Sequence, residues 1–102
     1  MAGLNCATPS HTAWPTLRDG LLGCVVISDE ESAGAMRDLS RLGIISGDCG
    51  AASLAALRAL MRDPECAELA GRAGLAPSSS VLLISTEGAT DPVSYAETLE
   101  RT

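Results

Sequence analysis

Hydroxyl-bearing residues follow an apolar stretch near the end of the sequence. Val81 to Ile84 is apolar throughout, and Ser85-Thr86-Glu87-Gly88 comes directly after it. A short apolar run of this kind is typical of a strand buried on both faces of a parallel sheet. Ligands of open α/β sheets bind at the carboxyl ends of the strands. The spacing therefore allows a polar ligand site at residues 85–88, with an ordinary polar turn as the alternative.

A glycine-flanked turn precedes the most alanine-rich segment of the chain. Gly47-Asp48-Cys49-Gly50 has the Gly-x-x-Gly spacing that exposes backbone N–H groups to an anion at the start of a helix. The carboxylate of Asp48 would repel a phosphate, so a simple helix N-cap at Asp48 is the favoured interpretation. The turn is a candidate for binding or for capping, and its sequence favours capping.

The single histidine and the four cysteines form no recognisable catalytic or metal motif. His11 has no nucleophile motif that it would activate, so a surface histidine is favoured. The cysteines stand at 6, 24, 49 and 66, too far apart in sequence for a typical zinc site. We predict reduced thiols, no metal site and a cytoplasmic protein.

Helical and apolar patterns alternate along the chain and predict how these candidate residues are positioned. Ser28-Asp29-Glu30-Glu31 has the spacing of a capping box, and Asp63-Pro64 and Asp91-Pro92 each combine an N-cap with proline at the first helical position. The predicted helices span 10–21, 29–42, 51–61, 64–72 and a terminal segment from 92, the predicted strands span 24–27 and 80–85, and 43–46 is a short strand or a connector. This order predicts an α/β fold, with a partial open parallel sheet of few strands and flanking helices in one segment over 1–102.

Composition limits the core and the partners. The chain has 102 residues, no Phe and many alanines, so we expect a thin core. Its formal net charge of −6 makes nucleic acid and anionic membranes poor partners. All seven basic residues are Arg, so no lysine side chain is present. The start of the chain also lacks the pattern of a signal peptide.

Several sequence blocks, in order, resemble the carboxyl-terminal part of the diaminopropionate ammonia-lyases. The matching blocks are Met1-Ala2-Gly3-Leu4-Asn5-Cys6-Ala7-Thr8-Pro9-Ser10, Ala13-Trp14-Pro15, Leu17-Arg18-Asp19-Gly20, Ile27-Ser28-Asp29-Glu30-Glu31, Gly50-Ala51-Ala52 with Leu54-Ala55-Ala56-Leu57, and Leu82 to Pro92. The resemblance implies a fragment of the tryptophan-synthase-β-like (fold type II) fold of pyridoxal-phosphate enzymes. It also implies an amino-acid lyase that is a homodimer when intact and that converts 2,3-diaminopropionate to pyruvate and ammonia.

The resemblance implies a cofactor-facing role for four residues. These are Thr86 as the hydrogen-bond donor to the pyridine nitrogen, Ser85 as the alternative donor, Gly3 and Asp48. The Schiff-base lysine, the acids that move protons and the phosphate loop of this family belong to earlier parts of a longer chain. We therefore expect a fragment that has no catalytic residue of its own and binds no pyridoxal phosphate covalently.

Two positions depart from the family pattern. Ala7 stands where the family usually has glycine, and Asp48-Cys49 stands where Glu-Ser is usual. Two other interpretations also stay open: a portion of a threonine or serine dehydratase-like enzyme, and a non-catalytic α/β interaction module. Asn5-Cys6 and Thr86-Glu87-Gly88 favour the ammonia-lyase.

Overall fold

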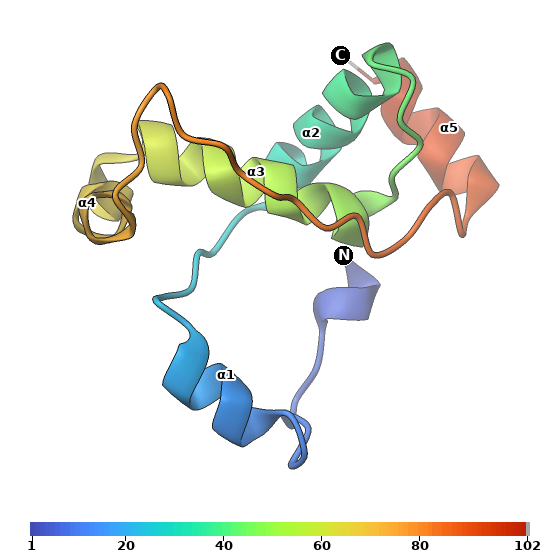
Figure 1. Cartoon of the computed structure of the whole chain (residues 1–102). Helices are drawn as coiled ribbons and strands as arrows, with labels where there is room; N and C mark the ends of the chain where they lie inside the picture. The colour runs from blue at the N-terminus through green and yellow to red at the C-terminus, as the bar shows by residue number, and fades with distance from the viewer. Residues whose placement is uncertain (102) are drawn as a thin grey trace.

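Helices α2 and α3 form the centre of the molecule in the computed structural model, which describes residues 1–101 (Figure 1). The elements in chain order are η1 (Ala2–Leu4), α1 (Trp14–Gly20), α2 (Asp29–Arg41), α3 (Asp48–Arg62), η2 (Pro64–Cys66), α4 (Ala67–Ala73) and α5 (Pro92–Glu100). Helices α3 and α5 both pack on α2, while η2 and α4 follow directly from the end of α3. None of the helices described here has the length and apolarity needed to cross a membrane.

Helix α2 begins at the predicted capping box. The Ser28 hydroxyl accepts a hydrogen bond from the Glu31 amide at 3.1 Å, and the Glu31 carboxylate accepts one from the Ser28 amide at 2.6 Å. Each interaction satisfies an N–H group that has no partner inside the helix. The helix ends before Gly43, whose positive φ of 80° suits a residue without a side chain.

The two cap-plus-proline signals are also confirmed. Asp63 accepts a hydrogen bond from the Glu65 amide at the start of η2, and Asp91 accepts one from the Ser94 amide at the start of α5. The segment predicted as one helix over 64–72 is a 3₁₀ turn followed by α4, which ends at Gly74 with a φ of 70°. Helix α3 starts at Asp48, earlier than predicted, because Gly47 takes the extended conformation of an N-cap.

The core is thin, as the composition predicts. Its buried residues are Ala35, Met36, Ala51 and Ala55, with Ile27, Leu39, Leu54 and Tyr95 packed around them. The alanines let α2 and α3 approach closely, but each removes little apolar area from water. Arg58 of α3 adds an ion pair to Asp38 of α2 at 2.6 Å.

The predicted α/β fold with an open parallel sheet is wrong for this chain, because no strand forms within residues 1–101. The segments at 24–27 and 80–85 lie outside the helices, as predicted, but neither pairs with a neighbouring strand. The segment at 43–46 likewise serves as the connector to α3. A β-branched apolar run favours an extended backbone, but a strand also needs a partner for its N–H and C=O groups. Without that partner, Val26 and Leu82 remain 94% and 87% exposed.

The amino-terminal segment and residues 85–88 reach the same end of α3. Residues 5–22, including α1, make a long excursion away from the core, while η1 contacts α3 (Figure 1). The segment after α4 runs back along α3 and reaches its amino-terminal end at residues 85–88. The start of α3 is therefore the point where distant parts of the sequence meet.

Candidate functional site

Three segments converge on the first turn of α3. The Gly47 amide donates to the carbonyl of Glu87 at 3.1 Å, and the Cys49 amide donates to the carboxylate Oε1 of Glu87 at 3.0 Å. On the side of η1, a Cβ added to Gly3 would lie 3.0 Å from the Sγ of Cys49. Residues 1–4, 46–50 and 85–88 thus form one cluster, and we call it the α3 junction.

Glycines make this close approach possible. A Cβ on Gly47 would lie 2.5 Å from the carbonyl oxygen of Gly88, and a Cβ on Gly50 would lie 2.5 Å from the Oγ of Ser46. Both distances are shorter than non-bonded atoms allow. The two glycines of the Gly-x-x-Gly motif therefore allow the 85–88 segment to pack closely against the helix.

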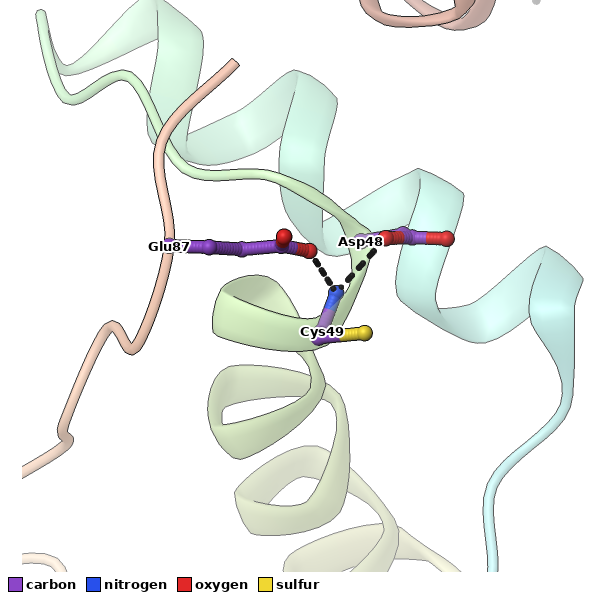
Figure 2. A group of neighbouring side chains, drawn as sticks. All are labelled: Asp48, Cys49 and Glu87. Carbon is purple, nitrogen blue, oxygen red and sulfur yellow. Dashed lines mark hydrogen bonds between the residues drawn. The ribbon is translucent and has the colours of Figure 1, made fainter. Parts of the chain in front are cut away.

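Two carboxylates cap the start of α3 (Figure 2). Asp48 Oδ1 and Glu87 Oε1 both accept the N–H of Cys49, at 2.9 and 3.0 Å. Glu87 is also held by the hydroxyl of Thr90, which donates to Oε2 at 3.1 Å. Negative groups are favoured there because the helix dipole and the free N–H groups make a helix N-terminus positive. The predicted N-cap at Asp48 is wrong, because Gly47 is the N-cap residue and Asp48 is the first residue of α3. Asp48 accepts the Cys49 amide from within the first turn, and Glu87 accepts the same amide from a distant segment.

The contacts of the junction shift the pKa values of three of its ionisable groups. The hydrogen bond between the α-ammonium of Met1 and Asp48, at 2.7 Å, raises the pKa of the amine and lowers the pKa of the carboxyl. Burial, followed by a hydrogen bond with Glu87, raises the pKa of the Cys49 thiol. Cys49 is therefore protonated at neutral pH, and a thiol is a poor metal ligand and nucleophile.

The side chains of Asp48, Cys49 and Glu87 also bring one sulfur and two carboxylate groups within 4.8 Å of one another. Such atoms are possible ligands for a cation. Here both carboxylates already bond to the first turn of α3, and the thiol is protonated. We therefore assign the cluster to helix capping.

A cavity of about 330 Å³ opens beside the junction. It is lined by Met1, Gly3, Met36, Gly47, Asp48, Cys49, Glu87, Gly88, Ala89, Thr90, Asp91, Ser94, Tyr95 and Thr98. The lining holds the carboxylates of Asp48, Glu87 and Asp91 against the single ammonium of Met1. Because like charges repel, this cavity disfavours a phosphate group.

The structure divides the four predicted cofactor residues between two places. Gly3 and Asp48 line the cavity, whereas Ser85 and Thr86 do not. The Ser85 hydroxyl lies 2.7 Å from the hydroxyl of Ser46 and 3.3 Å from the carbonyl of Glu87. Thr86 is exposed, and its hydroxyl makes no hydrogen bond within residues 1–101. His11 is exposed on the excursion, which agrees with a surface role.

Sequence reasoning did not assign roles to three residues of the junction. Ser46 ends a predicted connector, Cys49 is one of four scattered cysteines, and Glu87 belongs to a matching block, but no pattern gives any of the three a role. Glu87 lies 38 residues from Cys49, and Ser85 lies 39 residues from Ser46. The available signal was the pair of glycines at 47 and 50, which marks a close approach.

Comparison with known proteins identifies relatives over nearly the whole chain. The chain is 36% identical over 104 residues to a diaminopropionate ammonia-lyase of Salmonella typhimurium. This match covers 95% of this chain and 26% of the relative. The chain is also 36% identical over 102 residues to the enzyme of that name from Escherichia coli K12, with the same coverage. The resemblance to diaminopropionate ammonia-lyases is confirmed. No protein-family model matches the chain, and no solved structure matches it significantly.

The blocks that carry the resemblance meet at the α3 junction. The chain spans about a quarter of the length of these diaminopropionate ammonia-lyases, and the match covers nearly all of its residues. All three segments of the junction hold residues from the blocks that carry the resemblance. Sequence blocks that are distant in the chain are therefore neighbours in space.

Proposed function

We propose that this chain is part of a pyridoxal-phosphate-dependent ammonia-lyase that converts 2,3-diaminopropionate to pyruvate and ammonia. The observation that carries the proposal is the convergence of residues 1–4, 46–50 and 85–88 at the start of α3. These segments include residues of the blocks that resemble the ammonia-lyases, and they bring hydroxyl groups and a tightly packed helix start into one place. An amino-acid substrate, a homodimeric assembly and a cytoplasmic location belong to the same proposal.

We propose that residues 85–86 of the junction meet one part of the cofactor, the edge of the pyridine ring. Bound pyridoxal phosphate supplies an electron-withdrawing ring. The donors available for the ring nitrogen are the hydroxyls of Ser85 and Thr86, since the Glu87 carboxylate is held by α3 and Thr90. A neutral hydroxyl leaves that nitrogen largely unprotonated, which moderates electron withdrawal and favours prompt loss of the β-amino group. We propose Thr86 or Ser85 as this donor.

The acidic cavity does not fit the phosphate of the cofactor, and the chain has no lysine to bind it covalently. In the proposed enzyme, the phosphate site and the lysine lie in sequence other than these 102 residues. The role of this chain is to hold the ring edge and to fix the start of α3. Treating the chain with pyridoxal phosphate and borohydride should label only the α-amino group of Met1, and a stable label on any other peptide would contradict this.

A chimaera tests the proposed function. The matched region of the Escherichia coli relative is replaced by this chain, and pyruvate formation from 2,3-diaminopropionate is measured with lactate dehydrogenase. We expect the chimaera to form pyruvate, and we expect the relative without the matched region to form none. Activity on threonine or serine alone would favour a dehydratase. A folded chimaera that binds cofactor but is inactive on all three substrates would refute the proposal.

The same chimaera tests the hydroxyl donors. Thr86→Ala and Ser85→Ala are compared for elimination rate, cofactor affinity and absorbance spectrum. Ser80→Ala is the matched control, because it removes an exposed hydroxyl from the same segment, and that hydroxyl makes no hydrogen bond within residues 1–101. Unchanged values for both Thr86→Ala and Ser85→Ala would remove residues 85–86 from the site.

A further inference from the structure

A groove of about 730 Å³ lies between the end of α3, α4 and the segment that follows α4. It shares no lining residue with the cavity beside the α3 junction. Most of its lining is apolar, and the larger apolar residues are Leu57, Leu60, Met61, Leu75, Pro77 and Val81. Met61 is 66% exposed and Val81 is 46% exposed, so the groove presents apolar surface to water.

The sequence builds this groove at two breaks in the helical chain. Asp63-Pro64 ends α3 and starts the turn into η2 and α4. Gly74, with a φ of 70°, ends α4, and the chain then runs back along α3 (Figure 1). Leu75 of the returning segment therefore lines the same groove as Leu57 of α3.

The groove lacks the buried polar groups that orient a small ligand. Its charged or hydroxyl-bearing residues are Arg62, Asp63 and Ser79, and all three are exposed. The Asp63 carboxylate also accepts the Glu65 amide at 2.9 Å and thereby caps η2. Small-molecule sites combine an apolar lining with a few precisely placed polar groups. An apolar groove with an exposed polar rim is instead typical of a surface that contacts another polypeptide.

The length of the related enzymes indicates which polypeptide covers the groove. The match covers 26% of each ammonia-lyase, so about three quarters of such an enzyme lies outside this chain. A second copy of the chain is a poorer occupant, because each copy carries a formal net charge of −6 and like charges repel.

We propose that the groove is a docking surface for an apolar ridge of the same ammonia-lyase, from the part of the enzyme outside this chain. The inference rests on the proposed function and adds a contact surface at the opposite end of α3 from the junction. Apolar side chains of the ridge displace water from Leu57 and Met61, and this burial is the driving force for docking.

Cysteine accessibility tests this proposal in the chimaera with the Escherichia coli relative and in the 102-residue chain. Met61→Cys and Ala67→Cys each place a thiol in the groove. Peptide mass spectrometry follows modification by iodoacetamide and separates these thiols from the native cysteines. We expect modification to be slower in the chimaera than in the isolated chain by about tenfold or more, because a covered thiol is not accessible.

Two control positions lie outside the groove. Glu68→Cys is next to Ala67 on α4, and Leu42→Cys is at the end of α2, where Leu42 is 75% exposed. We expect both control thiols to react at similar rates in the chimaera and in the isolated chain. Similar rates for the groove thiols in the two proteins, or equal slowing at all four positions, would overturn the proposal. Groove thiols that become protected in the isolated chain as its concentration rises would make a second copy the occupant and would also overturn it.

A second measurement uses the 102-residue chain alone. The dye 8-anilinonaphthalene-1-sulfonate becomes fluorescent when it binds uncovered apolar surface. We expect Met61→Gln to weaken its binding about three- to tenfold and Leu42→Gln to leave it unchanged, with an unchanged far-ultraviolet circular dichroism spectrum for both. No dye binding, or equal binding to wild type and Met61→Gln, would overturn the proposal.

The readouts separate this inference from the proposed activity. Protected groove thiols in a chimaera that is inactive on 2,3-diaminopropionate would support the docking surface while the activity fails. Reactive groove thiols in an active chimaera would overturn the docking surface while the activity stands. A chimaera that does not form one folded protein would overturn the docking surface as well, because this chain would then not fit the rest of the enzyme.

Discussion

Replacing Gly50 by alanine tests the packing of the α3 junction most directly. The new Cβ would lie 2.5 Å from Ser46 Oγ and 2.8 Å from both the carbonyl oxygen of Glu87 and Ser85 Oγ. One of the three atoms is backbone, so a side-chain rotation alone cannot make room. The 85–88 segment must move away from the helix, which weakens the hydrogen bond between the Cys49 amide and Glu87.

Two opposing effects set the size of the change. Overpacking a tight site costs about 1–3 kcal/mol, whereas alanine in place of glycine favours a helix by about 1 kcal/mol. We expect Gly50→Ala to lower the free energy of unfolding by a net of about 1 kcal/mol, roughly a fivefold change in the folding equilibrium. Gly34→Ala in α2 is the matched control, because its Cβ would meet only the end of the Arg37 side chain, at 3.9 Å. The same substitution there should stabilise the chain by up to about 1 kcal/mol.

Urea unfolding followed by circular dichroism at 222 nm measures both variants. Amide hydrogen exchange locates the effect, and the Cys49 amide should exchange faster in Gly50→Ala but not in Gly34→Ala. If Gly50→Ala is as stable as Gly34→Ala, with an unchanged Cys49 amide, the three segments do not pack as described.

Four further predictions concern other features of the chain. Ser28→Ala removes half of the capping box and should cost about 1 kcal/mol in urea unfolding; an unchanged midpoint would contradict the cap. Iodoacetamide should modify Cys49 more slowly than the exposed Cys6 at neutral pH, as measured by peptide mass spectrometry, because burial raises the pKa of the Cys49 thiol, and the modification of Cys49 should accelerate as the pH rises. The hydrogen bond from Arg58 lowers the pKa of Asp38, so its ion pair contributes stability above the ordinary carboxyl pKa and loses it as the pH falls through the folded pKa. Asp38→Asn should therefore lower the free energy of unfolding by less than about 1 kcal/mol at neutral pH and leave it unchanged in strong acid. A loss of the same size at both pH values would rule out the ion pair. The exposed apolar side chains of the extended segments should make the isolated chain self-associate, which sedimentation measures. A monomer with a cooperative unfolding transition would contradict this.

Local sequence signals predicted the helices well, because their causes lie within a few residues. Ser28 and Glu31, or Asp91 and Pro92, contain the whole physical reason for a helix start. The strand predictions failed for a different reason. An apolar run such as Val81 to Ile84 indicates its own extended conformation but not whether a neighbouring strand is present to pair with it.

The candidate site shows the same limit. Ser85 and Thr86 were identified from their place after an apolar segment, and Gly3 and Asp48 through the family resemblance. The contacts of Ser46 with Ser85 and of Cys49 with Glu87 join residues that are 39 and 38 positions apart. Their types give no local pattern, so only the folded chain shows that they meet.

The separation of these contacts along the chain also bears on the order in which the molecule folds. Helices α2 and α3 are consecutive, and the connector between them is short, so their pairing has a small loop-closure entropy cost. The contacts of residues 85–88 with the start of α3 close a much longer loop, so we expect them to form after the rate-limiting step. Substitutions at Ala35 or Ala55 should then slow folding, whereas a substitution at Glu87 should mainly accelerate unfolding. The helix pair would exist before the groups of the candidate site come together on it.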